Sequence, residues 1–263
     1  MIIDFHTHIF PDKIVKATIE QLENRAKIKA FSDGTLKGLQ ESMKEANVDY
    51  SVVLPVATKP SQFKTLNDYA AEISKIEGII SFGGIHPDTP DYKAELDYIK
   101  SLSLKGIKLH PDYQHTFVDD EKILRIVDYA AKLDLIVSFH AGLDIGLPEV
   151  IHCPPNRSKN LLNALEYDKI VLAHTGGFAM WDEVEEYIVG KNVYLDISYS
   201  LGHIDDEQFV RIVRNHGVDK VLFATDSPWG GQKNTIEHFN KLAFTDEEKE
   251  KIFSGNARKL LHL

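Results

Sequence analysis

The first two histidines of the chain lie in a pattern that could bind a metal ion. Residues 2–8 read Ile-Ile-Asp-Phe-His-Thr-His, so His6 and His8 are two residues apart at the end of an apolar run. Side chains two apart on a strand point to the same face. The two imidazoles would therefore project together, and paired imidazoles form half of a typical transition-metal site. The chain has 12 histidines, so this pair alone could also arise by chance.

Polar residues that could join this site recur along the rest of the chain, at or near the ends of short apolar runs. In chain order they are His86, His110, His140, His174, Asp196 and Asp226. Packing gives no reason for an imidazole at the ends of so many strands. The repetition therefore favours one shared site at one edge of the fold.

Eight apolar, β-branched runs predict the strands that would position these residues, and helical periodicity fills the segments between them. The expected strands are Ile2–His6, Ser51–Leu54, Ile79–Gly84, Gly106–His110, Leu135–His140, Ile170–His174, Val193–Ile197 and Val221–Thr225. This alternation over about 250 residues predicts an α/β fold, a (β/α)8 barrel. A doubly wound open sheet is the alternative, but it would not usually place polar residues at nearly every strand end. No linker is visible, so we expect a single domain over residues 1–263.

The first connection is too long for one βα unit. Residues 9–50 hold helical stretches near Lys13–Ile28 and Thr35–Ala46, with Ser32 or Asp33 available to cap the second. We therefore expect a helical insertion after strand 1 that lies over the barrel mouth. It would be either a surface elaboration or a lid that sets specificity.

Several motifs resemble those of the amidohydrolase superfamily, and the resemblance spans residues 2–261. They are Asp4-Phe5-His6-Thr7-His8, His140, His174-Thr175-Gly176-Gly177, Thr225-Asp226-Ser227-Pro228-Trp229 and Gly255-Asn256-Ala257-Arg258-Lys259-Leu260. They are most similar to the amidohydrolase-related branch that includes aminocarboxymuconate-semialdehyde decarboxylase. The resemblance implies one divalent metal ion, usually zinc. It assigns the ligands to His6, His8, His140 and Asp226, and the catalytic acid/base role to His174.

The chemistry of this residue set agrees with that implication. Three neutral imidazoles and one carboxylate suit Zn²⁺, with Mn²⁺, Co²⁺ or Fe²⁺ as alternatives. A metal ion would lower the pKa of its bound water toward about 7. Asp226 could orient or deprotonate that water, and His174 could transfer a proton. The alternatives are a helix N-cap for Asp226 and a ligand or positioning role for His174.

Four further side chains are candidates for substrate binding, namely Lys108, His110, Arg157 and Trp229. Lys108 and His110 share one face of the fourth strand, so both would enter the barrel. Lys108 could instead be carboxylated and bridge two metals, or pair with a buried acid such as Asp4. Arg157 could bind an anionic group or remain solvated. Trp229 could wall an apolar pocket or cover the core.

Composition limits the classes of partner. The formal net charge of −10 argues against a protein that binds nucleic acid, although an anionic small molecule is still compatible with a local cationic pocket. The single cysteine, Cys153, excludes an intrachain disulfide and favours a reducing compartment. With no charged leader and no membrane span in the sequence, we expect a cytoplasmic protein. The family resemblance is compatible with a homodimer, although no sequence feature shows one.

These residues predict a metal-dependent hydrolase that cleaves a C–N or C–O bond of a small, anionic organic substrate. The alternative is a metal-dependent, non-oxidative decarboxylase of an unsaturated or aromatic carboxylate, which would use the same site. A non-catalytic metal-binding protein is a third reading, disfavoured because the ligand set is intact and His174 is present. Fold and site alone cannot choose between the first two reactions.

Overall fold

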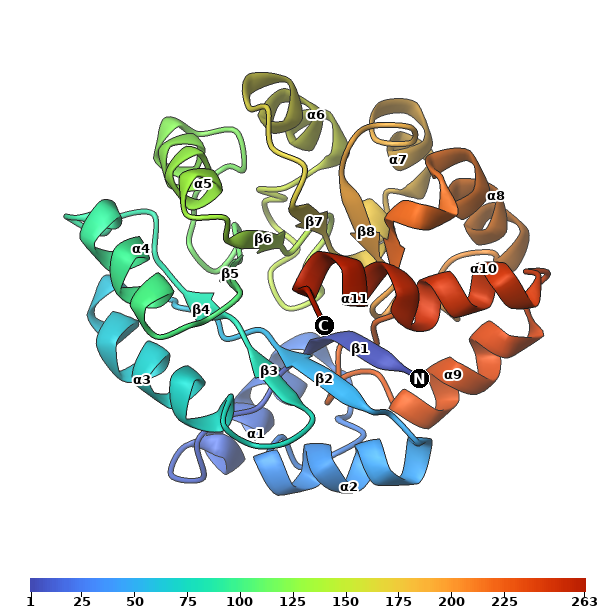
Figure 1. The fold of residues 1–263 in the computed structure, drawn as a ribbon, viewed down its shortest axis with the longest axis horizontal. Coiled ribbons are helices and arrows are strands. Elements are labelled where there is room, and N and C mark those ends of the chain that lie inside the picture. Colours follow the sequence, from blue (N-terminus) through green and yellow to red (C-terminus); the bar gives the residue numbers. More distant parts are fainter.

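The computed structural model describes all 263 residues as a ring of parallel strands surrounded by helices (Figure 1). The strands are β1 (Ile3–Thr7), β2 (Tyr50–Val53), β3 (Ile79–Ser81), β4 (Gly83–Gly84), β5 (Gly106–Leu109), β6 (Ile136–Phe139), β7 (Ile170–Leu172), β8 (Tyr194–Asp196) and β9 (Val221–Leu222). Parallel pairing joins β1, β2 and β3 in one set and β4 through β9 in a second. This is the α/β barrel that the strand pattern predicts.

Backbone hydrogen bonds close the ring between these two sets. β3 and β4 are separated by Phe82 alone, whose N–H donates to the carbonyl of Val53 at 2.9 Å. The expected third strand, Ile79–Gly84, is therefore present but interrupted. On the other side, the N–H of Phe5 donates to the carbonyl of Phe223 at 2.9 Å. The ring consequently holds its strand ends at one fixed rim.

The helices lie outside the ring, and the last helix crosses one end of the barrel (Figure 1). They are α1 (Val15–Ala26), α2 (Leu36–Ala46), α3 (Phe63–Ile73), α4 (Tyr92–Ser101), α5 (Glu121–Lys132), α6 (Pro155–Ala164), α7 (Trp181–Tyr187), α8 (Asp206–His216), α9 (Gln232–Lys241), α10 (Asp246–Glu250) and α11 (Asn256–Leu261). Helix α5 illustrates why they form. Its buried residues are Ile123, Ile126, Val127 and Ala130, which make one apolar face at helical spacing. No helix has both the length and the apolar character needed to cross a membrane.

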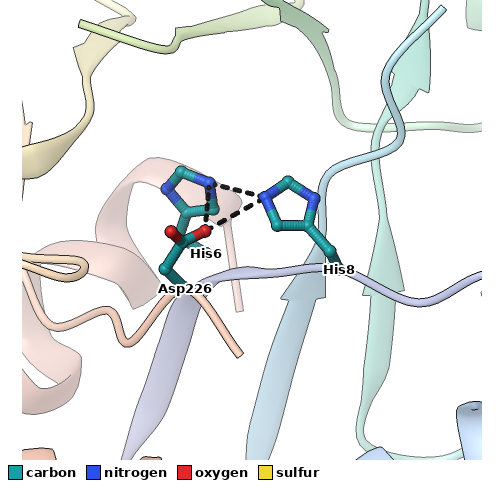
Figure 2. Close-up of side chains that lie close together, drawn as sticks. All are labelled: His6, His8 and Asp226. Atoms are coloured by element: carbon teal, nitrogen blue, oxygen red, sulfur yellow. Dashed lines mark hydrogen bonds and ion pairs between the residues drawn. The ribbon is translucent and has the colours of Figure 1, made fainter. Parts of the chain in front are cut away.

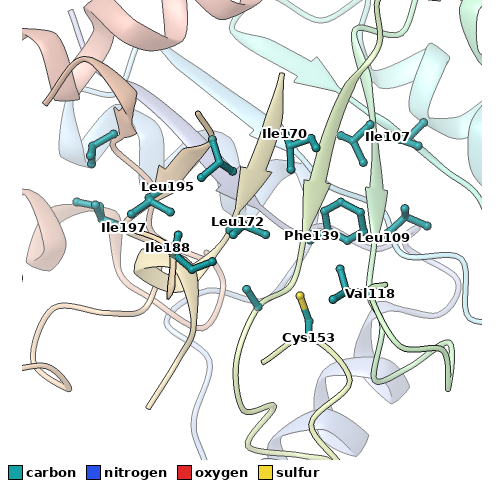
Figure 3. Close-up of a cluster of buried hydrophobic side chains, with 14 of the residues drawn as sticks. Ile107, Leu109, Val118, Phe139, Cys153, Ile170, Leu172, Ile188, Leu195 and Ile197 are labelled. Atoms are coloured by element: carbon teal, nitrogen blue, oxygen red, sulfur yellow. The ribbon is translucent and has the colours of Figure 1, made fainter. Parts of the chain in front are cut away.

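The core has two layers because strand side chains alternate between the two faces. Outward residues form one cluster with buried helix residues, and Figure 3 shows Leu109, Phe139 and Leu172 of this cluster on neighbouring strands. Inward residues such as Phe5 and Ile136 form a second cluster inside the barrel, closed by Leu260 of α11. Full burial of a side chain of this size stabilises the fold by about 1.5–3 kcal/mol. This alternation leaves the polar strand ends facing the barrel interior.

The insertion after β1 is helical, as expected, with α1 and α2 close to their predicted ranges. The prediction of its cap was wrong. Thr35 caps α2, because its hydroxyl accepts the N–H of Gly38 at 2.9 Å. The carboxylate of Asp33 accepts the N–H of Thr35 at 2.9 Å and so supports the cap from two residues earlier.

Candidate metal centre

Three of the predicted ligands meet at the carboxyl ends of the strands. Figure 2 shows the ring of His6 at the end of β1 and the ring of His8 just after it pointing toward each other, with Asp226 entering from the segment after β9. The Nε2 atoms of His6 and His8 are 3.1 Å apart. Oδ1 of Asp226 lies 3.4 Å from Nε2 of His6 and 3.1 Å from Nε2 of His8. Two imidazoles and a carboxylate in such a group could hold one metal ion.

The hydrogen bonds on the far sides of the two rings fix where their protons lie. Nδ1 of His8 is 2.8 Å from the carbonyl of Leu54, which can only accept, so Nδ1 carries the proton. Nδ1 of His6 is 3.0 Å from the carboxylate of Asp196 and is likewise the donor. In their neutral forms both rings therefore present an Nε2 lone pair to the same point. Beside the carboxylate of Asp226, these lone pairs point to a place where a metal ion could bind.

The protonation behaviour of the group agrees with a cation site. Burial, together with the charge of Lys108, lowers the pKa of His6 well below its usual value, so this ring is neutral near pH 7. Burial alone would raise the pKa of Asp226, but the imidazoles of His6 and His8 hold it below its usual value. The group therefore offers a neutral nitrogen and an ionised carboxylate, which are the forms that bind metals.

The backbone places Asp226 at the site at a conformational cost. Asp226 has φ 67°, in the left-handed region that non-glycine residues seldom adopt. Its N–H donates to the carbonyl of His6 at 2.8 Å, which ties the turn to β1. The next helix, α9, begins only at Gln232, so Asp226 does not serve as a helix N-cap. Strain of this kind is concentrated at functional sites.

His174 lies beside the three-residue group and is also held in the left-handed region, with φ 58°. Its Nδ1 is 3.0 Å from the carbonyl of Ser198, so Nδ1 carries a proton. Its Nε2 is 3.0 Å from Nδ1 of His140. Any proton that His174 gains or releases is therefore at Nε2, which is in contact with Nδ1 of His140.

His140 lies near the three-residue group but outside it. Its ring stacks on His110, with centroids 4.1 Å apart, and contacts His174 through Nδ1. Its Nε2 is buried and has no hydrogen-bond partner; the nearest carboxylate oxygen, of Asp112, is 3.9 Å away. Burial, followed by the neighbouring imidazoles, lowers the pKa of His140 well below its usual value. The structure therefore groups His140 with His110 and Asp144, a second set that could hold a metal ion, and not with the three predicted ligands; its unpaired Nε2 is available for a ligand.

Lys108 projects into the barrel as expected, and its side chain is fully buried. Its Nζ lies 3.3 Å from Nε2 of His6. Burial lowers the pKa of Lys108 to about 8, against the opposing effect of Asp196 and Asp226. The alternative pairing with Asp4 does not form, because Asp4 accepts hydrogen bonds from Thr225 and Gln232.

Asp196 holds the site together, a role that the sequence did not reveal. This fully buried carboxylate accepts the Nδ1 proton of His6, the N–H of His174 at 3.2 Å and the N–H of Ser198 at 3.0 Å. It also accepts a short hydrogen bond from the hydroxyl of Ser198. A carboxylate behind a metal-binding imidazole orients the ring and fixes its tautomer. The sign of this role in the sequence is the position of Asp196 at the end of the seventh predicted strand.

A large cavity opens above these residues, with a volume of about 1270 Å³. Its wall includes the predicted substrate-binding residues Lys108, His110 and Trp229. Arg157 lies elsewhere: its guanidinium pairs with Asp119 at 2.7 Å and stacks on Phe117, 3.9 Å from the ring centroid. Its charge is already neutralised there, so the structure does not bring Arg157 to the other site residues.

Comparisons with known proteins agree with this architecture. The chain matches an uncharacterised TIM-barrel protein from Bordetella bronchiseptica at 18% identity and TM-score 0.78, covering 99% of this chain and 98% of that one. It matches 2,6-dihydroxybenzoate decarboxylase complexed with 2,6-dihydroxybenzoate at 16% identity and TM-score 0.74, covering 100% and 99%. It also matches dihydroxybenzoic acid decarboxylase from Polaromonas sp. JS666, which has bound manganese and the inhibitor 2-nitroresorcinol. That match has 15% identity and TM-score 0.73, covering 100% and 97%.

These likenesses are between distant sequences and establish the barrel fold. No curated protein matches the chain. The model of the family described as amidohydrolase matches residues 3–263, which is nearly the whole chain. The family expected from the strand-end motifs is thereby confirmed, and this chain belongs to the amidohydrolase family.

Proposed function

We propose that this protein is a divalent-metal-dependent decarboxylase of an aromatic or unsaturated carboxylate. The observation that carries the proposal is the convergence of His6, His8 and Asp226 on one point at the floor of a large cavity. The decarboxylases among the similar structures favour this reaction over the hydrolysis that we expected first. Manganese in one of them makes Mn²⁺ the first ion to test, with Zn²⁺ second.

The ligand set fits a divalent ion. His6, His8 and Asp226 would hold it. The motif resemblance implies His140 as the fourth ligand, and we propose that role for its unpaired Nε2. Mixed nitrogen and oxygen donors suit Mn²⁺ as well as Zn²⁺. The bound ion would supply a positive charge that binds and orients the anionic substrate. The buried ammonium of Lys108, beside His6, would add a second positive charge on the same side.

The protein's own task in this reaction is to deliver a proton. The substrate carbon gains one proton and loses CO₂, and the electron pair of the broken C–C bond stays on that carbon. We assign the delivery to Nε2 of His174, because the carbonyl of Ser198 keeps Nδ1 occupied. The solvent then supplies a new proton to Nε2, so one proton is taken up for each CO₂ released. A positioned acid of this type contributes about 10²–10⁴-fold to rate.

Hydrolysis of a C–N or C–O bond is the second candidate. It rests on the same three-residue group, with Asp226 placed to accept a proton from an attacking water. It differs in its products, since hydrolysis releases no CO₂. One assay can therefore separate the two reactions.

The test is product analysis with the Mn²⁺-loaded protein. It would be incubated with 2,6-dihydroxybenzoate, other hydroxybenzoates and unsaturated carboxylates in D₂O. We expect CO₂ and a product with one deuterium at the vacated carbon. The His174→Ala variant, which retains the ligand set, would be the control and should release little CO₂. Cleavage of amides or lactones without CO₂ from any carboxylate would overturn the decarboxylase proposal in favour of hydrolysis.

A further inference from the structure

The cavity extends well beyond the metal-binding residues, as far as the inner face of α1. Helix α1 buries only Val15, although Leu22 and Ala26 face the barrel side. These side chains line the cavity instead of packing on the core. A volume of about 1270 Å³ exceeds the roughly 300–1000 Å³ of most small-molecule pockets. The cavity therefore has room for a substrate that reaches from the metal centre to α1.

Arg25, in the last turn of α1, offers a free positive charge to this cavity. It lines the wall and makes no ion pair within the protein. Its aliphatic stem lies over Gly146 in the loop after β6. A Cβ atom placed on Gly146 would be 3.5 Å from this stem. Its guanidinium lies 5.7 Å from the ring centroid of Tyr113. An arginine is always charged and binds carboxylates with two parallel hydrogen bonds.

The hydroxyl of Tyr113 is a second donor on the same cavity wall. Tyr113 also lines the cavity, and no protein group accepts a hydrogen bond from its hydroxyl. Burial, followed by the charge of Asp144, raises the pKa of Tyr113 to about 12, so the hydroxyl keeps its proton. Asp144, the carboxylate on this wall, lies 3.4 Å from Nε2 of His110; burial lowers the pKa of His110 well below its usual value, so this contact with a neutral imidazole is not an ion pair. Arg25 and Tyr113 therefore present unpaired donors side by side.

A row of rings connects this pair to the metal centre. The ring of Tyr113 contacts His110, with centroids 4.5 Å apart, and His110 stacks on His140 at 4.1 Å. His140 in turn contacts His174. A flat apolar body could lie along this row, with one end at His174 and the other at Arg25.

We propose that Arg25 and Tyr113 form an anion-binding subsite, and that the substrate is an elongated dicarboxylate with an aromatic or apolar body. This inference rests on the proposed function, since one carboxylate is the reacting group at the metal. The second carboxylate binds at Arg25 and is not lost. Arg25 is thus a residue that determines specificity, supplied by the insertion after β1.

The test compares two probes that differ in one carboxylate, biphenyl-4,4′-dicarboxylate and biphenyl-4-carboxylate, together with shorter one-ring pairs of the same kind. Their dissociation constants would be measured by calorimetry on wild type, Arg25→Gln and Arg25→Lys. We expect Arg25→Gln to weaken binding of the dicarboxylate about tenfold or more, while the dissociation constant of the monocarboxylate changes less than about twofold. Arg25→Lys should lose less, because it keeps the charge. Arg157→Gln, an arginine outside the cavity, is the matched control and should change neither probe.

Two results would overturn the subsite. One is an Arg25→Gln variant whose dissociation constants equal those of wild type for every pair of probes; this includes the case in which neither protein binds any probe. The other is an equal loss for the mono- and dicarboxylate. Repeating the titration on metal-free protein separates this inference from the proposed function. A difference between the probes that persists without metal, and vanishes in Arg25→Gln, supports the subsite even where no CO₂ is released.

Discussion

Replacing Asp196 by asparagine should weaken metal binding without removing any proposed ligand. Asp196 accepts the Nδ1 proton of His6 at 3.0 Å and so keeps the Nε2 lone pair of His6 directed at the metal site. Asparagine has nearly the same volume but only one acceptor oxygen, and its amide N–H groups donate. An amide facing His6 would favour the other tautomer, with the proton on Nε2. That tautomer cannot bind a metal through Nε2.

The size of the effect follows from the bonds that Asp196 makes. Four donors from three residues, His6, His174 and Ser198, converge on this fully buried carboxylate, more than one amide oxygen can satisfy. Loss of one hydrogen bond to a charged, buried group costs about 1.5–3 kcal/mol. That free energy corresponds to metal binding that is roughly 10- to 100-fold weaker, seen as a higher dissociation constant. Mutation of a group that hydrogen-bonds a metal-binding histidine from behind typically weakens metal binding by the same factor.

The assay is a competition titration of Mn²⁺ against a chelator of known affinity. Wild type and Asp196→Asn would be compared with Asp119→Asn, a carboxylate that pairs with Arg157 away from the cavity. Circular dichroism would establish that each variant is folded. A folded Asp196→Asn protein with wild-type affinity for Mn²⁺ would refute the argument from the tautomer of His6.

Three further predictions concern catalysis, stability and reactivity. His174→Ala should retain Mn²⁺ but lose about 10²–10⁴-fold in turnover, measured by initial rates; unchanged turnover would remove its proposed role. Excess EDTA should lower the melting temperature by roughly 5–10 °C relative to protein with Mn²⁺ at 100 times its dissociation constant, because bound metal stabilises only the folded state. Equal melting temperatures would argue against a metal site in the folded protein. Cys153 should not react with a thiol reagent at pH 8 until the protein is denatured, because burial raises its pKa to about 12. Rapid labelling of the native protein would contradict that placement.

Local sequence patterns predicted most of the barrel because its strands and helices depend on local spacing. Each strand end carries its polar residue within a run whose alternation is visible in the sequence, as with Lys108 on β5. The convergence of His6 and Asp226 could be expected for the same reason, since parallel strands end at one rim.

Features that depend on tertiary contacts could not be predicted in this way. Arg157 and Arg25 both follow strands in long connections, and nothing local distinguishes them. Only the folded chain shows that Asp119 neutralises Arg157 and that α1 brings Arg25 to the cavity. The N-cap of α2 was predicted at the wrong residue for a related reason. Asp33 and Thr35 are both suitable N-cap residues, and the hydrogen bond between them, visible only in the structure, leaves Thr35 as the cap.

The central claim is that one divalent ion binds between His6, His8 and Asp226. Anomalous diffraction at the manganese edge, from crystals grown with Mn²⁺, tests it most directly. We predict a strong peak between the Nε2 atoms of the two histidines and the carboxylate of Asp226. No peak there, or a peak only within the second group of His110, His140 and Asp144, would contradict the account.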